Sequence, residues 1–291
     1  LRLFFAGDPA YAGRVQALER ASGQRLARLE DKALARQLFG EKLFLSPTQV
    51  ETYHQCRFQY FCRYGLNAKE RRRAEVDVLQ YGTLMHYLFE RIFRLPAEER
   101  RQWTEEELLS RVQGLIEAYA QENMGGMELL SGREKYRLSR LAQSACRLIR
   151  HVEEELAQSR FVPEHLEWGL GFGRDYPPLR IDTGKGIVTV GGTIDRVDVY
   201  LGSDGCRYVR VIDYKTGHKS FRLPDVLLGL NMQMLVYLAA LVESGRELPA
   251  GVLYMPAAEP SVSVDRGARE EKIKAEADKQ LKMSGVVLSD Q

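Results

Sequence analysis

Residues 191–217, GGTIDRVDVYLGSDGCRYVRVIDYKTG, decide the fold of this chain. Two segments in which apolar and polar residues alternate flank the turn-forming letters GSDG, a pattern typical of two antiparallel strands joined by a hairpin. If Leu201 pairs with Arg207, the same register places Asp195 directly across from Asp213. A slip of one residue would put these aspartates on opposite faces, so the chemistry depends on the register. Two adjacent glycines before the first strand can introduce a bulge, which leaves the register a hypothesis.

The predicted hairpin brings two carboxylates and an ammonium group together. Side chains alternate along a strand, so Lys215 shares a face with Asp213 while Tyr214 points away. Two aspartates about 5 Å apart repel each other, and a hard divalent cation resolves this. Carboxylate oxygens suit Mg²⁺ or Mn²⁺, whose bound water can become a nucleophile, and Lys215 can stabilise charge on a phosphate oxygen. The set indicates phosphodiester hydrolysis.

These residues resemble a known family. GGTIDRVDVY and VIDYKTG look like the central hairpin of PD-(D/E)xK nucleases of the RecB-like branch, with Asp195, Asp213 and Lys215 in the signature positions. The resemblance implies a restriction-endonuclease-like α/β fold, with a mixed central sheet flanked by helices and a helical N-terminal elaboration. It also implies a Mg²⁺-dependent deoxyribonuclease of the exonuclease type, with the backbone carbonyl of Tyr214 among the metal ligands.

Two helical motifs extend the resemblance on either side of the hairpin. YGTLMHYLFE resembles the upstream helix of this branch, whose histidine, here His86, is a metal ligand. QMLVY resembles its Q-x-x-x-Y element, and places Gln233 and Tyr237 one helical turn apart, near Lys215 or the scissile phosphate. Taken singly, His86 is more often a core histidine, and the other two can be the polar edge of a packed helix.

The flanks of the chain resemble AddB-type helicase–nuclease subunits of bacteria. The segments that carry this resemblance are LSPTQVETYHQCRFQYFCRYGL, LYMP and KMSGVVL. It implies a parent protein that processes DNA ends, single-stranded or duplex, in double-strand break repair with an AddA-like partner subunit. In these subunits the cysteine matching Cys56 is one of four ligands of a four-iron, four-sulfur cluster. The other three belong to a C-x-x-C-rich segment that these 291 residues do not contain, so we expect no intact cluster here.

Several charged residues near these motifs leave alternatives open. Glu90, one turn from His86, can orient the imidazole or pair with a neighbouring arginine. Glu164 and Glu167 precede the hairpin, and one of them could approach the metal, but the spacing does not select between them.

Two further charged groups have less specific interpretations. The run from Lys69 to Arg73 can line a DNA path or form a solvated loop. Arg196 and Asp198 belong to the hairpin face opposite Asp195, where we expect surface or structural ion pairs.

Composition sets broad limits on function. The 291 residues are 44% hydrophobic and 28% charged with a formal net charge of +2, so net charge alone does not argue for a nucleic-acid partner. The sequence shows no secretion signal and no long apolar run, and its four cysteines are too few for a disulfide framework, so we expect an intracellular, cytoplasmic protein. A phosphate-binding G-x-x-x-x-G-K-[ST] element does not occur, so these residues should not hydrolyse ATP.

The chain divides into a short connecting segment and one domain. We expect residues 1–45 to connect to a preceding region of a longer parent chain, and residues 46–291 to form a nuclease domain that is truncated at its C-terminus. Periodicity predicts helices over residues 46–64, 83–95, 104–122, 133–159, 225–244 and 266–282, and strands over 164–173, 186–200, 206–215 and 251–256.

Two rival functions share the same residues. A Cas4-like stand-alone exonuclease would keep the three signature residues but end in its own cysteine cluster. A catalytically silent DNA-binding scaffold would keep the fold, although loss of an aspartate or of the lysine is its usual sequence mark.

Overall fold

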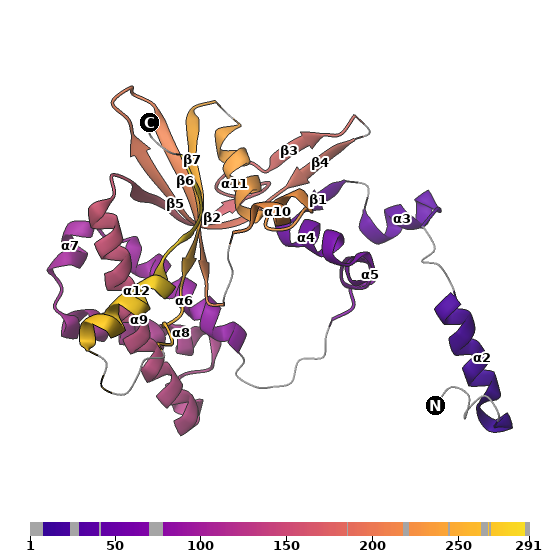
Figure 1. Cartoon of the computed structure of the whole chain (residues 1–291), viewed down its shortest axis with the longest axis horizontal. Coiled ribbons are helices and arrows are strands. Elements are labelled where there is room, and N and C mark those ends of the chain that lie inside the picture. The colour runs from indigo at the N-terminus through magenta and orange to yellow at the C-terminus, as the bar shows by residue number, and fades with distance from the viewer. Residues whose placement is uncertain are drawn as a thin grey trace.

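The computed structural model of the chain describes residues 8–23, 29–40, 42–69, 78–184, 186–217, 221–243, 245–262, 267 and 269–288. A mixed five-stranded sheet forms the centre of the molecule (Figure 1). In spatial order its strands are β2 (Val162–Leu170), β5 (Gly192–Leu201), β6 (Arg207–Lys215), β7 (Glu247–Pro256) and β8 (Ser284–Val287). Only β6 and β7 run parallel among these five, and the mixed sheet that we predicted is confirmed.

The β5–β6 hairpin has the predicted register. Its pairs run from Leu201 with Arg207 to Arg196 with Ile212. The turn is closed by a hydrogen bond from the amide of Gly202 to the carbonyl oxygen of Cys206, 2.9 Å long. This tight connection fixes the register, because a hairpin loop of given length and geometry allows one pairing.

The strand that we expected over residues 186–200 is divided, so that prediction was wrong in one respect. At Gly191 the chain leaves β5, and the preceding residues form β4 of a second, three-stranded sheet. That sheet contains β1 (Leu43–Leu45), β4 (Ile187–Val190) and β3 (Leu179–Asp182), in this order. A Cβ atom at position 191 would lie 2.5 Å from the carbonyl oxygen of Leu170, so only glycine allows this close backbone approach.

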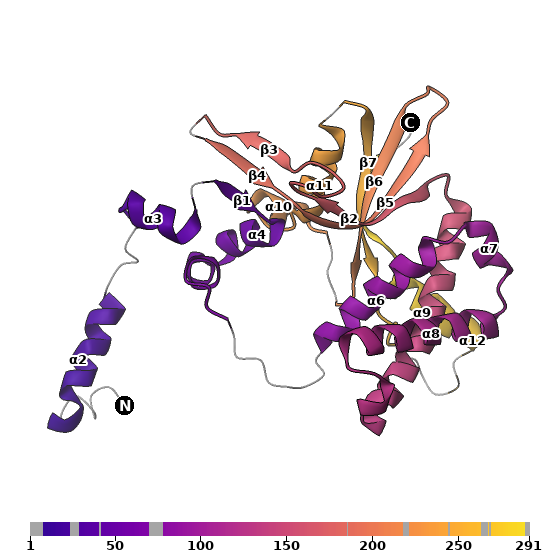
Figure 2. The same cartoon turned by 180° about the vertical axis from the view of Figure 1, so that it is seen from behind.

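Helices cover one face of the large sheet with a continuous apolar core. They are α6 (Val78–Phe93), α7 (Ala97–Gln102), α8 (Glu105–Asn123) and α9 (Gly132–Gln158), followed at the end of the chain by α12 (Glu270–Leu281). Leu88 and Phe89 of α6 and Ile149 of α9 are fully buried in this core. Capping boxes at Thr104 and Ser131 start α8 and α9, close to the predicted ranges. Figure 2 shows α6, α8, α9 and α12 grouped together beside the large sheet.

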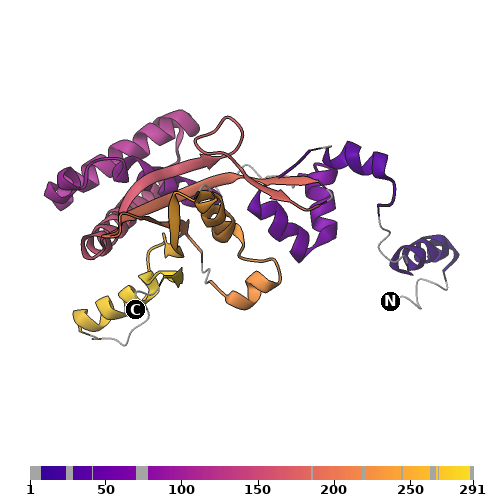
Figure 3. The ribbon, with the colours of Figure 1, turned by 90° about the horizontal axis from the view of Figure 1, so that it is seen from above.

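The opposite face carries α11 (Gln233–Val242), which packs against the strands through Met234 and Leu241 (Figure 3). The single helix that we expected over residues 225–244 is interrupted after α10 (Leu223–Leu227). Gly229 and Asn231 have φ values of 77° and 56°, in the left-handed region that ends a helix. This break determines where α11 begins.

The N-terminal helices differ from the prediction at one point. The expected helix over residues 46–64 is divided at Cys56, whose φ of −157° is extended. Ser46 starts it with a capping box, as its sequence indicated. The helical elements on this side are α2 (Pro9–Gly23), α3 (Lys32–Phe39), α4 (Pro47–Gln55), α5 (Arg57–Tyr60) and a π-helical turn (Phe61–Gly65), and a 3-10 turn (Met127–Leu129) joins α8 to α9. Within the described ranges, no helix is long and apolar enough to cross a membrane.

Candidate active site

The predicted site residues meet where β5 begins and β6 ends. Asp195 and Asp213 lie one step beyond the last pair of the hairpin register, and their exposed fractions are only 8% and 3%. Helix α6 passes this end of the sheet and contributes His86. Helix α11 contributes Gln233 from the other face. The hairpin, the upstream helix and the downstream helix therefore converge at one place.

Asp195 is held by the main chain of the neighbouring strand. Its Oδ2 accepts a hydrogen bond of 2.7 Å from the amide of Tyr214, and its Oδ1 lies 3.6 Å from Nδ1 of His86. Burial, followed by the nearby charge of Asp213, raises the pKa of the Asp195 carboxyl to about 7. Without an added cation, this carboxylate is poorly stabilised at neutral pH.

Asp213 contacts two groups that the sequence placed near it. Lys215 forms an ion pair with its Oδ2, and Nε2 of Gln233 donates a hydrogen bond of 3.1 Å to its Oδ1. The Lys215 ammonium also lies 5.8 Å from the centre of the Tyr254 ring, within the range of a cation–π contact. The face that Asp213 and Lys215 were predicted to share is confirmed by this ion pair.

His86 lies between two acceptors. Its Nε2 is 3.3 Å from the carbonyl oxygen of Tyr214, and its Nδ1 is 3.2 Å from Oε1 of Glu167. Burial opposes protonation of the imidazole, but the hydrogen bond to Glu167 and the charge of Asp195 outweigh it and raise the pKa of His86. The histidine and the Tyr214 carbonyl, two predicted ligands, thus lie in contact.

Glu167 is the carboxylate that the sequence could not select. It is level with Asp195 on the neighbouring strand, between the pairs Leu166 with Arg196 and Trp168 with Ile194. Its φ of 48° is left-handed, a conformation that costs a non-glycine residue about 1–2 kcal/mol. Glu167, His86 and Asp195 are, within the described part of the chain, the group of acidic and histidine side chains placed closely enough to share a metal ion.

Glu164 and Glu90 each form an ion pair with an arginine. Glu164 lies at the bulge of β2 and pairs with Arg207 at 2.8 Å. Glu90 pairs with Arg94 at 2.6 Å, one turn along α6, and Glu167 is the carboxylate that contacts His86. The arginine alternative for Glu90 is therefore the one that the structure contains.

Tyr237 lies against the start of β5. Its hydroxyl occupies the space that a Cβ atom at Gly192 would need, so glycine is required there. Burial first, and then the charges of Asp195 and Asp213, raise the pKa of Tyr237 to about 12. The phenol therefore stays protonated at neutral pH and remains a hydrogen-bond donor beside the carboxylates.

The donor set of the site fits a hard divalent cation. The carboxylates of Glu167 and Asp195 and the carbonyl of Tyr214 offer oxygen ligands around the imidazole of His86, and the carboxylate of Asp213 follows on the neighbouring strand, outside this closest group. The Oδ2 atom of Asp213 is buried, and its partner is the Lys215 ammonium. A cation at the carboxylates would offset the burial and the nearby charge of Asp213, which together raise the pKa of Asp195.

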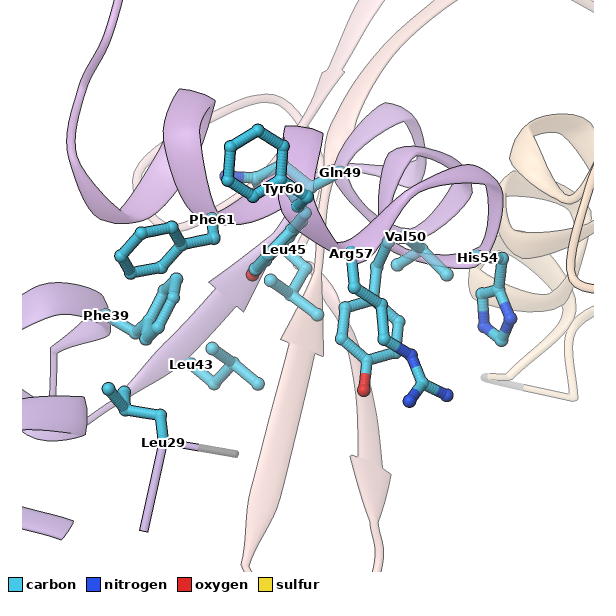
Figure 4. A pocket seen from close by; sticks show the side chains of 12 residues that line it. Leu29, Phe39, Leu43, Leu45, Gln49, Val50, His54, Arg57, Tyr60 and Phe61 are labelled. Atoms are coloured by element: carbon cyan, nitrogen blue, oxygen red, sulfur yellow. The ribbon is translucent and has the colours of Figure 1, made fainter. Parts of the chain in front are cut away.

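Two other sequence predictions lie away from this site. Within the run Lys69 to Arg73, residues 70–73 fall outside the described residues. Cys56 is an exposed free thiol, and the other cysteines, all within the described ranges, are free as well. A separate apolar groove lies between α3, β1, α4 and α5, lined by aromatic side chains such as Phe39, Tyr60 and Phe61 (Figure 4), and the candidate site residues are not among those that line it.

Comparison with protein families shows which family the chain belongs to. The model of the PD-(D/E)XK nuclease superfamily matches residues 44–285, which include the hairpin and both flanking helices. The chain belongs to the PD-(D/E)XK nuclease superfamily. The matched range includes the hairpin, α6 and α11, whose sequence motifs carried the resemblance to this family.

Similar curated proteins are subunits of larger machines. The chain is 37% identical over 266 residues to a subunit of the ATP-dependent helicase/deoxyribonuclease of Clostridium novyi, a match that covers 88% of this chain and 23% of that protein. It is 32% identical over 303 residues to the subunit of the same name from Ruminiclostridium cellulolyticum, covering 99% of this chain and 26% of that protein. The nuclease domain therefore spans about a quarter of the length of the relatives that it matches.

Proposed function

We propose that this chain hydrolyses DNA phosphodiester bonds with Mg²⁺ or Mn²⁺ as the metal ion. The observation that carries the proposal is the convergence of Asp195, Asp213 and Lys215 at one end of the sheet, with a buried carboxylate whose pKa is raised to about 7. Perturbed carboxyl groups of this kind cluster at functional sites. Membership of the nuclease superfamily supports the assignment.

The proposed metal ligands are His86, Asp195, Asp213 and the carbonyl oxygen of Tyr214. Glu167 adds a carboxylate that either binds the ion or holds the imidazole of His86 in place. A divalent cation bound there would supply Lewis acidity toward the phosphate and toward water. Burial keeps the carboxylates of Asp195 and Asp213 poorly hydrated, so little water competes with a cation for their oxygen atoms.

Three side chains beside the carboxylates have proposed roles toward the phosphate. Lys215 would orient the attacking water and stabilise the negative charge that develops on a phosphate oxygen. Gln233, through its hydrogen bond to Asp213, would hold that carboxylate in one orientation. Tyr237, which stays protonated, would donate a hydrogen bond toward the scissile phosphate.

We further propose that the nuclease domain works within a longer helicase–nuclease subunit. The support is the match to relatives named as subunits of an ATP-dependent helicase/deoxyribonuclease, over a quarter of their length. The parent protein would act in the cytoplasm on single-stranded or duplex DNA ends with an AddA-like partner, cut as an exonuclease, and hold an iron–sulfur cluster through Cys56. ATP hydrolysis would belong to other parts of that assembly.

Cleavage of a labelled single-stranded oligonucleotide tests the hydrolytic proposal. Wild-type chain should degrade it with Mg²⁺ and lose this activity in EDTA, while Asp195→Ala and Lys215→Ala should abolish the activity and keep the circular dichroism spectrum of the wild type. Lys279→Ala, on the exposed surface of α12, is the matched control and should cleave normally. Equal cleavage by all four proteins would refute the assignment.

Binding of Mn²⁺ separates a nuclease from a silent DNA-binding scaffold. Calorimetric titration of the wild type should show binding that Asp213→Asn weakens strongly. DNA binding without any heat from Mn²⁺ would favour the scaffold.

A further inference from the structure

A buried ion cluster lies on the face of the β5–β6 hairpin opposite the carboxylates. Arg196 and Asp198 have exposed fractions of 1% and 0%. Nε of Arg196 lies 2.8 Å from Oδ1 of Asp198, and Arg210 approaches Oδ2 of Asp198 with Nη2 at 2.8 Å. The predicted ion pair is therefore structural and deeply buried. Such a pair persists only if its hydrogen-bonding groups find partners.

Arg196 has a further contact that leads back to the site. Its Nη1 donates a hydrogen bond of 3.3 Å to the hydroxyl of Tyr214. The Tyr214 ring packs against Phe89 in a T-shaped contact with ring centres 4.7 Å apart, and the residue is 2% exposed. A buried ring that is hydrogen-bonded at its hydroxyl and packed against its neighbours has few positions available to it.

Tyr214 joins the two faces of the sheet through its main chain. Its amide donates to Asp195 at 2.7 Å, and its carbonyl oxygen lies 3.3 Å from Nε2 of His86. The side chain reaches Arg196 on the reverse face, while the amide and carbonyl of the same residue face the candidate ligands. One residue therefore connects the ion cluster on the reverse face to both the Asp195 carboxylate and the His86 imidazole.

We propose that Arg196 is a positioning residue of the metal site and acts through Tyr214. By holding the phenol, it fixes the amide that orients Asp195 and the carbonyl that faces the cation. Asp198 holds the guanidinium of Arg196, and Arg210 in turn donates a hydrogen bond to Oδ2 of Asp198. This inference rests on the proposed function, because it concerns the affinity of the same site for a divalent cation.

Removal of one oxygen atom tests the proposal. Tyr214→Phe keeps the ring and the main chain but removes the acceptor of the Arg196 hydrogen bond. Partners that orient metal ligands typically change metal affinity by about 10- to 100-fold, and we expect the dissociation constant for Mn²⁺ to rise about 10-fold. Arg196→Met should raise it at least as much. Isothermal titration and the electron paramagnetic resonance of free Mn²⁺ both measure this change without DNA.

The matched control is Tyr208→Phe in the same strand. The Tyr208 hydroxyl donates to Asp204 beside the hairpin turn, at the far end of the strand from the carboxylates. Its removal should leave the Mn²⁺ affinity unchanged. In Tyr214→Phe, cleavage should recover toward the wild-type rate at saturating Mn²⁺, because the change affects binding of the ion. A purely structural role would lower the melting temperature and leave the dissociation constant at its wild-type value.

Each outcome decides between the two proposals. Folded Tyr214→Phe with wild-type Mn²⁺ affinity would overturn the positioning role while the hydrolytic proposal stands. If the wild type binds no Mn²⁺ at all, the proposed function fails, and the inference fails with it. Should Arg196→Met not fold, Tyr214→Phe alone carries the test, since it leaves the buried ion pairs intact.

Discussion

The two faces of the β5–β6 hairpin treat buried carboxylates in opposite ways. On the reverse face, Asp198 is fully buried between two arginines, and its charge raises the pKa of Arg196 although burial opposes that charge. On the front face, the Lys215 ammonium pairs with Asp213, and the pKa of Asp195 is raised to about 7, first by burial and then by the charge of Asp213. Removal of one partner from a paired buried charge is costly, whereas a buried carboxylate that lacks a full partner is stabilised when a cation binds beside it. This contrast supports the front face as the proposed functional site.

The largest expected effect is a loss of DNA cleavage when one residue of the front face is changed. Asp213→Asn should lower the rate of Mg²⁺-dependent DNA cleavage by about 1,000-fold or more, because it removes a charged ligand and the partner of Lys215. The fold should survive, since Asn keeps the shape of the side chain. Single-turnover cleavage measures the rate, and Asp278→Asn on the exposed side of α12 serves as the control. A rate within about tenfold of the wild type would show that the Asp213 carboxylate is dispensable for cleavage.

A substitution on the reverse face should lower the stability of the fold. Asp198→Asn leaves the buried guanidinium of Arg196 and the partly buried one of Arg210 without their carboxylate, and loss of one partner of a buried ion pair costs about 3–5 kcal/mol. Urea denaturation followed by circular dichroism measures the loss. If the variant unfolds at the wild-type urea concentration, the cluster contributes little and the contrast between the faces disappears.

In the absence of metal, Asp195→Asn should raise the stability of the fold, which is the opposite of the effect expected for Asp198→Asn. The pKa of Asp195 is raised in the folded state from 3.8 to about 7, so the folded chain binds this proton more tightly than the unfolded chain. Stability is therefore lost as the pH rises through that window, and Asn removes the loss. In EDTA at pH 8 the variant should be more stable than the wild type by about 1–3 kcal/mol. A difference between the two proteins that does not vary from pH 4 to pH 8 would contradict the raised pKa.

The smallest expected effect concerns a carboxylate outside both faces. Glu90 pairs with Arg94 on the partly exposed side of α6, and such pairs contribute about 0.3–0.5 kcal/mol. Glu90→Gln should therefore change the stability by no more than this and leave the Mn²⁺ affinity unchanged in calorimetry. A clear loss of affinity would move Glu90 into the metal site.

Local pattern made much of the fold and site predictable. The turn between Leu201 and Arg207 fixes the register of the hairpin, and alternation then places Lys215 beside Asp213. The helices with strong apolar periodicity, α8 and α9, were also found at the predicted ranges. These features depend on neighbours in the sequence, which is the information that a single sequence carries.

Features set by distant contacts were missed. Gly191 divides a predicted strand because it meets the backbone of Leu170. Glu167 could not be chosen over Glu164, since a bulge in β2 and a left-handed residue interrupt the alternation that would have distinguished them. The break at Asn231 ends one helix and sets the position of Gln233 on α11. In each case tertiary contact overrides the local pattern.

Crystals soaked in Mn²⁺ give the most direct test of a divalent cation at the carboxylates of Asp195 and Asp213. Anomalous scattering at the manganese edge locates the ion independently of the protein phases. The account predicts a peak bounded by His86, Asp195, Asp213 and the carbonyl oxygen of Tyr214 in the wild type, and its loss in Asp213→Asn. A fully soaked wild-type crystal with no peak at these residues would contradict the metal site and the nuclease mechanism built on it.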